Sequence, residues 1–204
     1  MTKTIAVIVC LSASGCIAAD NGATAAVQGG AASFIVNTTV PGVSVKGKST
    51  ALEARAVVQH QGEGLRLENL EASLPVRSIL TGMAIRDEHM RRYIFTAPDG
   101  TTPDLRFAGG DTLCTAQAEH PGEFSCKIYG TLAIRGVARP FAIPLKLRVE
   151  GQAFRGAFDS TVKLSDYDIE QPSQFGVKTA NEIQVHLDFT AKEAAAAIAS
   201  GAAR

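Results

Sequence analysis

The sequence lacks an excess of charge of either sign, and it lacks the short motifs that mark common enzyme chemistry. Its 204 residues carry 20 basic and 20 acidic side chains, so nothing in the charge favours a nucleic-acid partner. It has no G-x-S-x-G elbow, no HExxH, no P-loop and no dinucleotide-binding fingerprint. The four histidines, His60, His89, His120 and His186, do not have metal-ligand spacing. Absence of these motifs does not exclude an enzyme, but nothing here calls for one, and we predict no catalytic residue, metal or cofactor.

A long hydrophobic segment is missing from the N-terminal region, where the apolar run over residues 5–11 is short. Such a run cannot cross a bilayer as a permanent helix. Because Lys3 precedes it and small residues follow it, the pattern is typical of an export signal. We therefore predict a protein of the periplasm or cell envelope.

Residues 13–16, with the sequence Ala-Ser-Gly-Cys, resemble a bacterial lipobox, in which the cysteine is lipidated and becomes the new N-terminus. This favours a signal peptide over residues 1–16 and a membrane anchor at Cys16, although Ala13 stands where leucine is usual. The alternative is ordinary cleavage after Ala19 or Ala25, which would discard Cys16.

The composition also suggests where the folded domain begins and ends. Residues 17–32 are small and mostly uncharged, which predicts a flexible tether. Residues 192–204 form an alanine-rich tail without a strong apolar stripe. The predicted domain therefore spans residues 33–191.

Two cysteines remain in this domain, on either side of a Glu-His-Pro-Gly-Glu turn signal. Folding the chain about His120 places Cys114 opposite Cys126, and Ala116 opposite Phe124. The register predicts a cross-strand disulfide and hence an oxidising compartment, whereas a CxxC-type metal or redox pair does not fit the spacing. By the chain-entropy argument such a small loop contributes about 3 kcal/mol.

Alternation of apolar and polar residues, the period of a β-strand, recurs through most of the domain. It is longest over residues 127–149, which predict two strands joined by a Gly/Pro connector at residues 136–140. At residues 68–69 the alternation changes parity, which predicts a β-bulge or bend. Over residues 83–95 the apolar positions follow a helical spacing instead.

These segments give eight or nine amphipathic strands joined mostly by short turns. An antiparallel sheet of that size usually closes, because closure removes exposed edges. We therefore predict an all-β fold, an antiparallel β-barrel with one or two short helices. An interior of eight strands holds packed side chains or one slender ligand.

Three segments carry a resemblance to a known family. The first is SILTG at residues 78–82 followed by RDEHM at 86–90, and the second is GTLAIRGVARP at 130–140. The third combines DYDI at 166–169, GVK at 176–178 and NEI at 181–183. In their order and spacing these segments resemble the YceI-like family of bacterial envelope proteins, from about residue 34 to residue 191.

The resemblance implies an extended eight-stranded antiparallel barrel, lipocalin-like in shape and usually exported. Several members are understood to hold a polyisoprenoid lipid or isoprenoid quinone, so such a lipid is the expected partner here. Two positions depart from the family pattern. The Asp-His pair that commonly opens the first strand is absent before Phe34, and the arginine that commonly starts the late loop motif is replaced near Ser165.

The candidate ligand-binding residues are the inward positions of the predicted strands and two residues of the predicted helix. The inward set comprises Phe34, Val36, Leu74, Leu132, Ile134, Phe141, Ile143, Leu145, Phe154, Phe158, Val185 and Leu187. Alternation does not distinguish a lipid cavity from a filled core, although the small inward residues Gly130, Gly156 and Ser160 favour space. Burying an apolar tail contributes up to about 0.8 kcal/mol per CH2.

The helix residues allow two interpretations. Arg86 or His89 could meet a ligand head group from a lid over the barrel mouth. In the alternative, Asp87 pairs with a nearby basic residue and only fixes the helix to the sheet.

Three functions stay open at this point. The favoured one is a non-enzymatic carrier or reservoir of an isoprenoid lipid. The alternatives are a structural or stress-response envelope module with a solid core and a protein partner, and an enzyme acting on a lipid head group at residues 86–89. The oligomeric state is not predicted.

Overall fold

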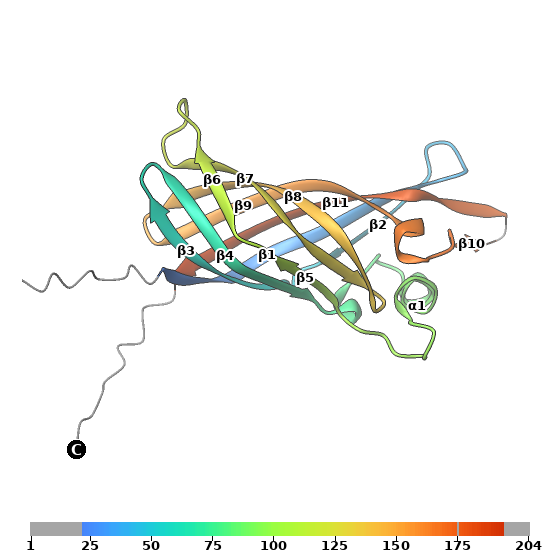
Figure 1. Ribbon diagram of the computed structural model, residues 1–204. Coiled ribbons are helices and arrows are strands. Elements are labelled where there is room, and N and C mark those ends of the chain that lie inside the picture. The colour runs from blue at the N-terminus through green and yellow to red at the C-terminus, as the bar shows by residue number, and fades with distance from the viewer. Residues whose placement is uncertain (1–21, 175, 194–204) are drawn as a thin grey trace, which may run out of the picture.

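The computed structural model describes residues 22–174 and 176–193, which form a closed antiparallel β-barrel covered at one end by a helix (Figure 1). The strands are β1 (Ala23–Thr38), β2 (Ser44–Ser49), β3 (Glu53–Gln61), β4 (Gly64–Leu74), β5 (Leu105–Gly109), β6 (Thr112–Ala116), β7 (Glu123–Ile134), β8 (Val137–Glu150), β9 (Ala153–Lys163), β10 (Ser173–Gln174) and β11 (Val177–Glu193). The helical elements are the 3₁₀ turns η1 (Val76–Ser78) and η3 (Leu164–Tyr167), the α-helix α1 (Ala84–Met90) and the π-helical turn η2 (Arg91–Phe95). Within the described part of the chain, none of these helices is long and apolar enough to span a membrane.

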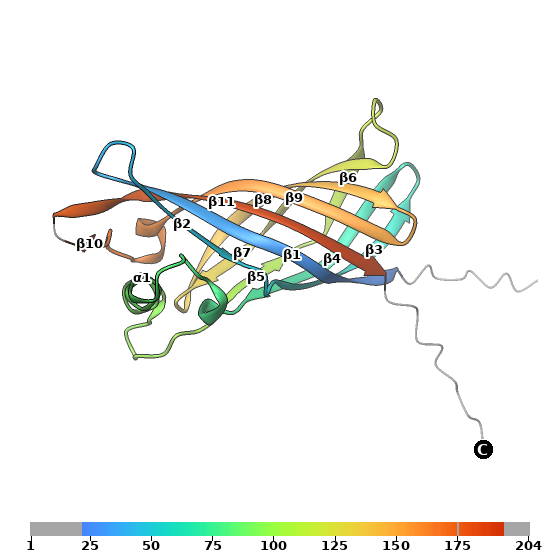
Figure 2. The same ribbon diagram turned by 180° about the vertical axis from the view of Figure 1, so that it is seen from behind.

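The barrel wall has eight strand positions, because two pairs of strands each share one position. β2 and β3 both pair with β1, and β5 and β6 both lie between β4 and β7. β1 also pairs with β11 along nearly its whole length, which closes the sheet (Figure 2). The predicted eight-stranded antiparallel barrel is confirmed.

The first strand begins earlier than the sequence indicates. β1 starts at Ala23, so the prediction of a flexible tether is wrong for residues 23–32. These residues are small, but Ala25 is buried between its partners Ala56 on β3 and Glu193 on β11. β11 likewise continues to Glu193, two residues into the predicted tail. The predicted signal peptide, Cys16 and the rest of the tail lie outside the described residues.

The hairpin of β7 and β8 is tighter than predicted. Its turn consists of Arg135 and Gly136 alone, both with positive φ angles of 46° and 84°, as a type I′ turn requires. The predicted connector at residues 136–140 is therefore wrong, since Val137 to Pro140 already pair with β7.

Proline changes the pairing on the other side of β8. Pro140 and Pro144 have no N–H to donate, and β8 pairs with β9 only from Lys146 onward. In the part of β8 that precedes Lys146, the side chain of Arg139 connects β8 to residues that follow β9. Its Nε donates to the Asp166 carbonyl at 2.6 Å, and its Nη2 contacts Asp168 Oδ2 at 3.2 Å. We call this unpaired stretch between β8 and β9 the β8–β9 seam.

The predicted parity change in β4 is confirmed as a β-bulge. The register of β3 against β4 shifts between Arg55 and Val57, which face Glu71 and Glu68 respectively. Asn69 lies in the bulge with a φ angle of 52°, a conformation that asparagine tolerates better than most residues.

The predicted helix over residues 83–95 is confirmed as α1 followed by η2. Two contacts fix the chain before it. Leu80 exchanges backbone hydrogen bonds of 2.9 Å with Lys48 of β2. Thr81 then donates from its amide, at 2.7 Å, and from its hydroxyl to Asp87 Oδ1. The helix is thereby tied to the barrel wall.

Asp87 is a buried carboxylate, with only 5% of the residue exposed. Burial on its own would raise its pKa, but the two hydrogen bonds from Thr81 and the charges of Arg91 and Arg86 together lower it below the ordinary value. Asp87 thus anchors the helix, as one interpretation proposes. Its hydrogen-bond partner, however, is Thr81 and not a basic side chain, because the threonine amide and hydroxyl reach it first.

We expect Asp87→Asn to lower the melting temperature at neutral pH, because the buried donors of Thr81 lose a charged acceptor, a loss of about 1–3 kcal/mol. A carboxylate whose pKa is lowered by folding stabilises the protein above its unfolded pKa of about 4, and this contribution is lost as the pH falls through the folded pKa. The difference between wild type and variant should therefore be constant above about pH 5 and shrink below about pH 4. Glu88→Gln, at the exposed neighbouring residue, is the control; an equal difference at pH 3 and pH 7 would contradict the assignment.

The predicted disulfide between Cys114 and Cys126 is present, with the predicted register of Ala116 opposite Phe124. Both cysteines are buried among the side chains of the barrel interior. The bond joins β6 to β7 across a separation of 12 residues.

Replacing both cysteines by alanine should lower the free energy of unfolding by about 3 kcal/mol, because the unfolded chain regains the entropy of the opened loop. Urea denaturation with and without a thiol reductant measures the change. The reductant should act on the wild type and leave the Cys114→Ala/Cys126→Ala protein unchanged. Equal unfolding midpoints for all four samples would show that the disulfide does not stabilise the fold.

Candidate functional site

A cavity of about 1400 Å³ occupies the barrel interior. Its wall is formed mainly by inward-facing apolar side chains from strands around the whole barrel. It extends from Ala25 and Ala191 to α1, which lies at the other end of the barrel (Figure 1). We call that other end the α1 end. The interior is therefore hollow, and the alternative of a solid core does not describe this structure.

All the candidate ligand-binding residues face this cavity. The strands contribute Phe34, Val36, Leu74, Leu132, Ile134, Phe141, Ile143, Leu145, Phe154, Phe158, Val185 and Leu187. Arg86 and His89 reach it from α1, whereas Asp87 between them is turned away toward Thr81. The alternation of the strands thus predicts the lining correctly.

The prediction that inward glycines create the space in the barrel is wrong. Gly130 and Gly156 do not leave room for a ligand, because aromatic rings fill the space beside them. A Cβ on Gly130 would lie 2.6 Å from the Phe107 ring, and one on Gly156 would lie 2.2 Å from the Phe189 ring. The two glycines leave space for these rings, and Phe107 and Phe189 themselves line the cavity.

Several lining residues were missed. Phe107, Ile183 and Phe189 follow the same alternation as the predicted set, so the strand pattern could have identified them. Tyr167 could not be found this way, because it lies in the 3₁₀ turn η3. Burial and the charge of Asp166 raise the pKa of the Tyr167 phenol while Arg139 opposes them, so the phenol stays protonated at neutral pH.

Polar lining residues gather at the α1 end. Arg86 is held by Thr81, with Nε 2.9 Å from the hydroxyl oxygen and Nη2 2.7 Å from the carbonyl oxygen. His89 Nδ1 lies 3.3 Å from Oε1 of Gln174 on β10, and its ring meets the edge of Tyr93 at 5.9 Å. These contacts connect the helix to the opposite rim of the cavity.

Among the described residues, two that line the cavity each carry a buried polar atom without a hydrogen-bond partner. These atoms are Nε of Arg135, in the turn between β7 and β8, and Oγ1 of Thr179, near the start of β11. Buried polar atoms are nearly always paired, by protein, water or ligand. Both atoms have almost no accessible surface, so they lie behind the cavity wall and are not open to the cavity.

The remaining histidines do not gather at the cavity. His186 Nδ1 lies 2.8 Å from Asp159 on the outer wall, and His120 lies in the turn between β6 and β7. Among residues 22–174 and 176–193, no group of three histidine, cysteine or acidic side chains is placed to hold a metal ion.

Known structures share this architecture. BcnA of Burkholderia cenocepacia is 16% identical, with a TM-score of 0.59 over 79% of this chain and 95% of that one. A Saccharophagus degradans domain, described as polyisoprenoid binding and implicated in plant cell wall breakdown, is 12% identical, with a TM-score of 0.59 over 83% and 98%. The Campylobacter jejuni YCEI protein is 18% identical, with a TM-score of 0.59 over 76% and 89%.

At these identities the structures establish the fold alone. Comparison with curated protein sequences gives no match. The profile of the YceI-like domain, however, matches residues 24–191, which is most of the chain and almost all of the barrel from β1 to β11. The chain therefore belongs to the YceI-like domain family.

Proposed function

We propose that the protein holds one isoprenoid-type lipid, with its tail in the barrel and its polar head at the α1 end, for carriage or storage. The observation that carries this proposal is the apolar cavity of about 1400 Å³, which is larger than the roughly 300–1,000 Å³ of ordinary small-molecule pockets. The Saccharophagus degradans domain of the same fold, described as polyisoprenoid binding, supports the same class of ligand.

The cavity wall suits an apolar chain. Its side chains lack partners across the empty space, and a hydrocarbon would supply the missing contacts. Each buried CH2 contributes up to about 0.8 kcal/mol, so a few isoprene units offset the entropy lost on association. The rings of Phe107 and Phe189 form part of this apolar wall.

The head group would lie among Arg86, His89, Arg135 and Thr179. Arg135 and Thr179 line this end of the cavity, and Arg86 keeps donors beyond the two bonds that it makes to Thr81. A quinone oxygen or a phosphate accepts hydrogen bonds from such groups. This assignment makes the predicted lid residues part of the binding site.

A catalytic role for residues 86–89 has little support. Asp87 is the carboxylate that an acid–base pair with His89 would require, but it is buried against Thr81 outside the cavity wall. We therefore propose a binding protein and not an enzyme.

Lipid retention is tested by native mass spectrometry of the exported protein, followed by organic extraction. The wild type should carry a stoichiometric hydrophobic mass, and Leu132→Asp should lose it, because burying an unpaired carboxylate beside a hydrocarbon costs several kcal/mol. Leu113→Asp is the matched control, since Leu113 is 62% exposed on the outer wall. Val185→Trp, which narrows the cavity without adding charge, should also reduce retention.

Two results would contradict the proposal. One is a full lipid complement in a folded Leu132→Asp protein. The other is a wild-type protein that is free of lipid and takes up no added isoprenoid quinone.

We also propose that the chain is exported and that Cys16 carries a lipid anchor. The disulfide is consistent with export, since such bonds persist in oxidising compartments. Cleavage after Ala25 would remove residues 23–25, which pair with β3 and include the buried Ala25. The structure therefore favours processing upstream of Ala23.

The mass of the mature N-terminal peptide tests this assignment. We expect a peptide that begins at a diacylglyceryl-modified Cys16. A peptide beginning at Asp20 would remove the anchor and leave the barrel intact, whereas one beginning at Ala26 would also contradict the pairing of β1 with β3.

A further inference from the structure

Large hydrophobic side chains are exposed mainly at one end of the molecule. Four of them, Leu80, Met83, Ile85 and Tyr93, lie in or directly before α1 and η2, and we call these four residues the α1 patch. Two more, Val40 and Val43, lie in the turn between β1 and β2, at the same end of the barrel (Figure 1). Elsewhere in the described residues, large exposed hydrophobic side chains occur singly, as at Leu113 and Tyr129.

The α1 patch is continuous with the cavity. Met83, Ile85 and Tyr93 are more than half exposed to solvent and also line the cavity wall. Ile85, His89 and Tyr93 follow one another at intervals of four residues along the helix, so they form one edge of the cavity mouth. An apolar path thus leads from the barrel interior to the outside of the lid.

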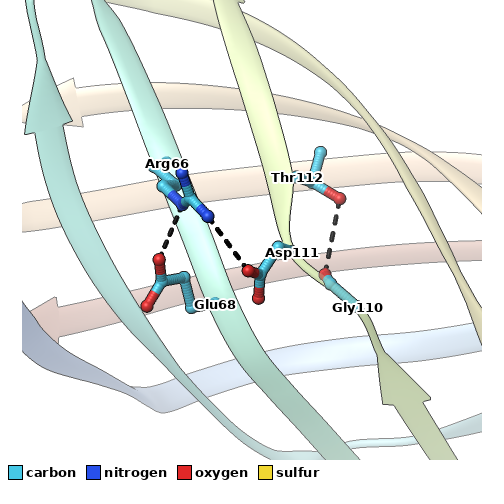
Figure 3. Close-up of polar contacts among 5 residues, drawn as sticks. All are labelled: Arg66, Glu68, Gly110, Asp111 and Thr112. Carbon is cyan, nitrogen blue, oxygen red and sulfur yellow. Dashed lines mark hydrogen bonds and ion pairs between the residues drawn. The ribbon is translucent and has the colours of Figure 1, made fainter.

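The arginines divide into two sets. Five arginines on the barrel strands are paired with carboxylates: Arg55, Arg66, Arg139, Arg148 and Arg155. Figure 3 shows the arrangement at Arg66, which lies 2.6 Å from Glu68 and 3.0 Å from Asp111. The arginines for which the described residues provide no carboxylate within ion-pair distance are Arg77, Arg86, Arg91, Arg92, Arg106 and Arg135.

This second set surrounds the α1 end. Arg77 lies in η1, Arg86 in α1, and Arg91 and Arg92 in η2, while Arg106 pairs with Ala133 two residues before Arg135. The carboxylates nearby bind uncharged donors and keep their negative charge: Asp87 binds Thr81, Asp99 binds Thr101 and Asp104 binds the Val76 amide. Glu170 adds a further carboxylate to the cavity lining. Glu88 is the exposed carboxylate within α1.

From these observations we infer that the α1 end docks on an anionic lipid bilayer. The α1 patch inserts at the interface, and Arg77, Arg91 and Arg92, which lie outside the cavity wall, contact lipid phosphates. Apolar side chains beside cationic ones are the composition of a surface that binds the membrane interface. Tyr93 suits this position because its ring is apolar and its hydroxyl is polar, and Arg92 lies over that ring at 5.7 Å.

A docked α1 end would open the cavity directly toward the bilayer, so a lipid could move between the two without crossing water. This route rests on the proposed lipid function, whereas the docking does not. Vesicle binding measures docking whether or not the cavity carries a ligand, so failure of either proposal can be recognised separately.

The test is sedimentation with vesicles of phosphatidylethanolamine and phosphatidylglycerol in a 3:1 ratio, compared with pure phosphatidylcholine. The chain carries Cys16→Ala so that no anchor contributes. We expect binding to the anionic vesicles that weakens as salt is added. Arg91→Gln/Arg92→Gln should weaken it about 25-fold, since each arginine near such a surface contributes about fivefold.

The outer wall provides matched controls. Ile85→Ser should reduce binding about tenfold through lost insertion, while Leu113→Ser should not, although the two side chains are 61% and 62% exposed. Tyr93→Ser and Tyr129→Ser form a second pair, at 55% and 61% exposure, because Lys127 lies over the Tyr129 ring as Arg92 lies over Tyr93. Arg148→Gln/Arg155→Gln removes the same charge from the wall.

Two outcomes would overturn the inference. One is the absence of wild-type binding to the anionic vesicles at low salt, in which case the α1 patch would serve a protein partner instead. The other is equal loss of binding in the α1 variants and in their outer-wall controls. Binding would then depend on the net charge and hydrophobicity of the protein and not on the α1 end.

Discussion

The fold depends on the pairing of its first strand with its last. β1 and β11 are 16 and 17 residues long and pair along almost all of that length, while β1 also holds β2 and β3 on its other side. Without this joint the sheet would have two long open edges and no enclosed interior. The cavity, the position of α1 above it and the separation of inward from outward side chains all follow from closure.

Much of this architecture can be predicted where strongly apolar residues alternate with polar ones. Ile183, Val185, Leu187 and Phe189 alternate with polar residues, and the pattern predicts both the strand and the face that it buries. The start of β1 could not be predicted, because residues 23–33 are mostly alanine and glycine. Neighbouring residues there differ too little in hydrophobicity to show an alternating pattern. There the partners decide the structure: neighbouring strands supply hydrogen bonds that local propensity does not require.

The candidate site shows the same division. The lining residues can be predicted because every second residue of a strand faces the barrel interior. The existence of a cavity depends instead on the summed volume of side chains from all the strands. The pairs Gly130–Phe107 and Gly156–Phe189 illustrate this point, since each combines a small and a large residue that are distant in sequence. The contrast between paired and unpaired arginines is equally invisible in the sequence. On the barrel wall it arises from cross-strand register, which places Arg55 opposite Glu71, whereas Arg91 lies in the helical turn η2, outside the sheet.

The β8–β9 seam has a consequence for what the barrel can enclose. Where strands are hydrogen-bonded, their spacing is fixed at about 4.8 Å and the circumference cannot change. Along the seam the wall is instead held by packing of Ile134, Val137 and Phe141 with Val162 and Leu164, and by the side chain of Arg139. Side chains adjust by changing rotamer, which does not break a ladder. The width of the barrel near the α1 end is therefore not fixed by backbone hydrogen bonds alone, because side chains also set the distance between β8 and β9 there.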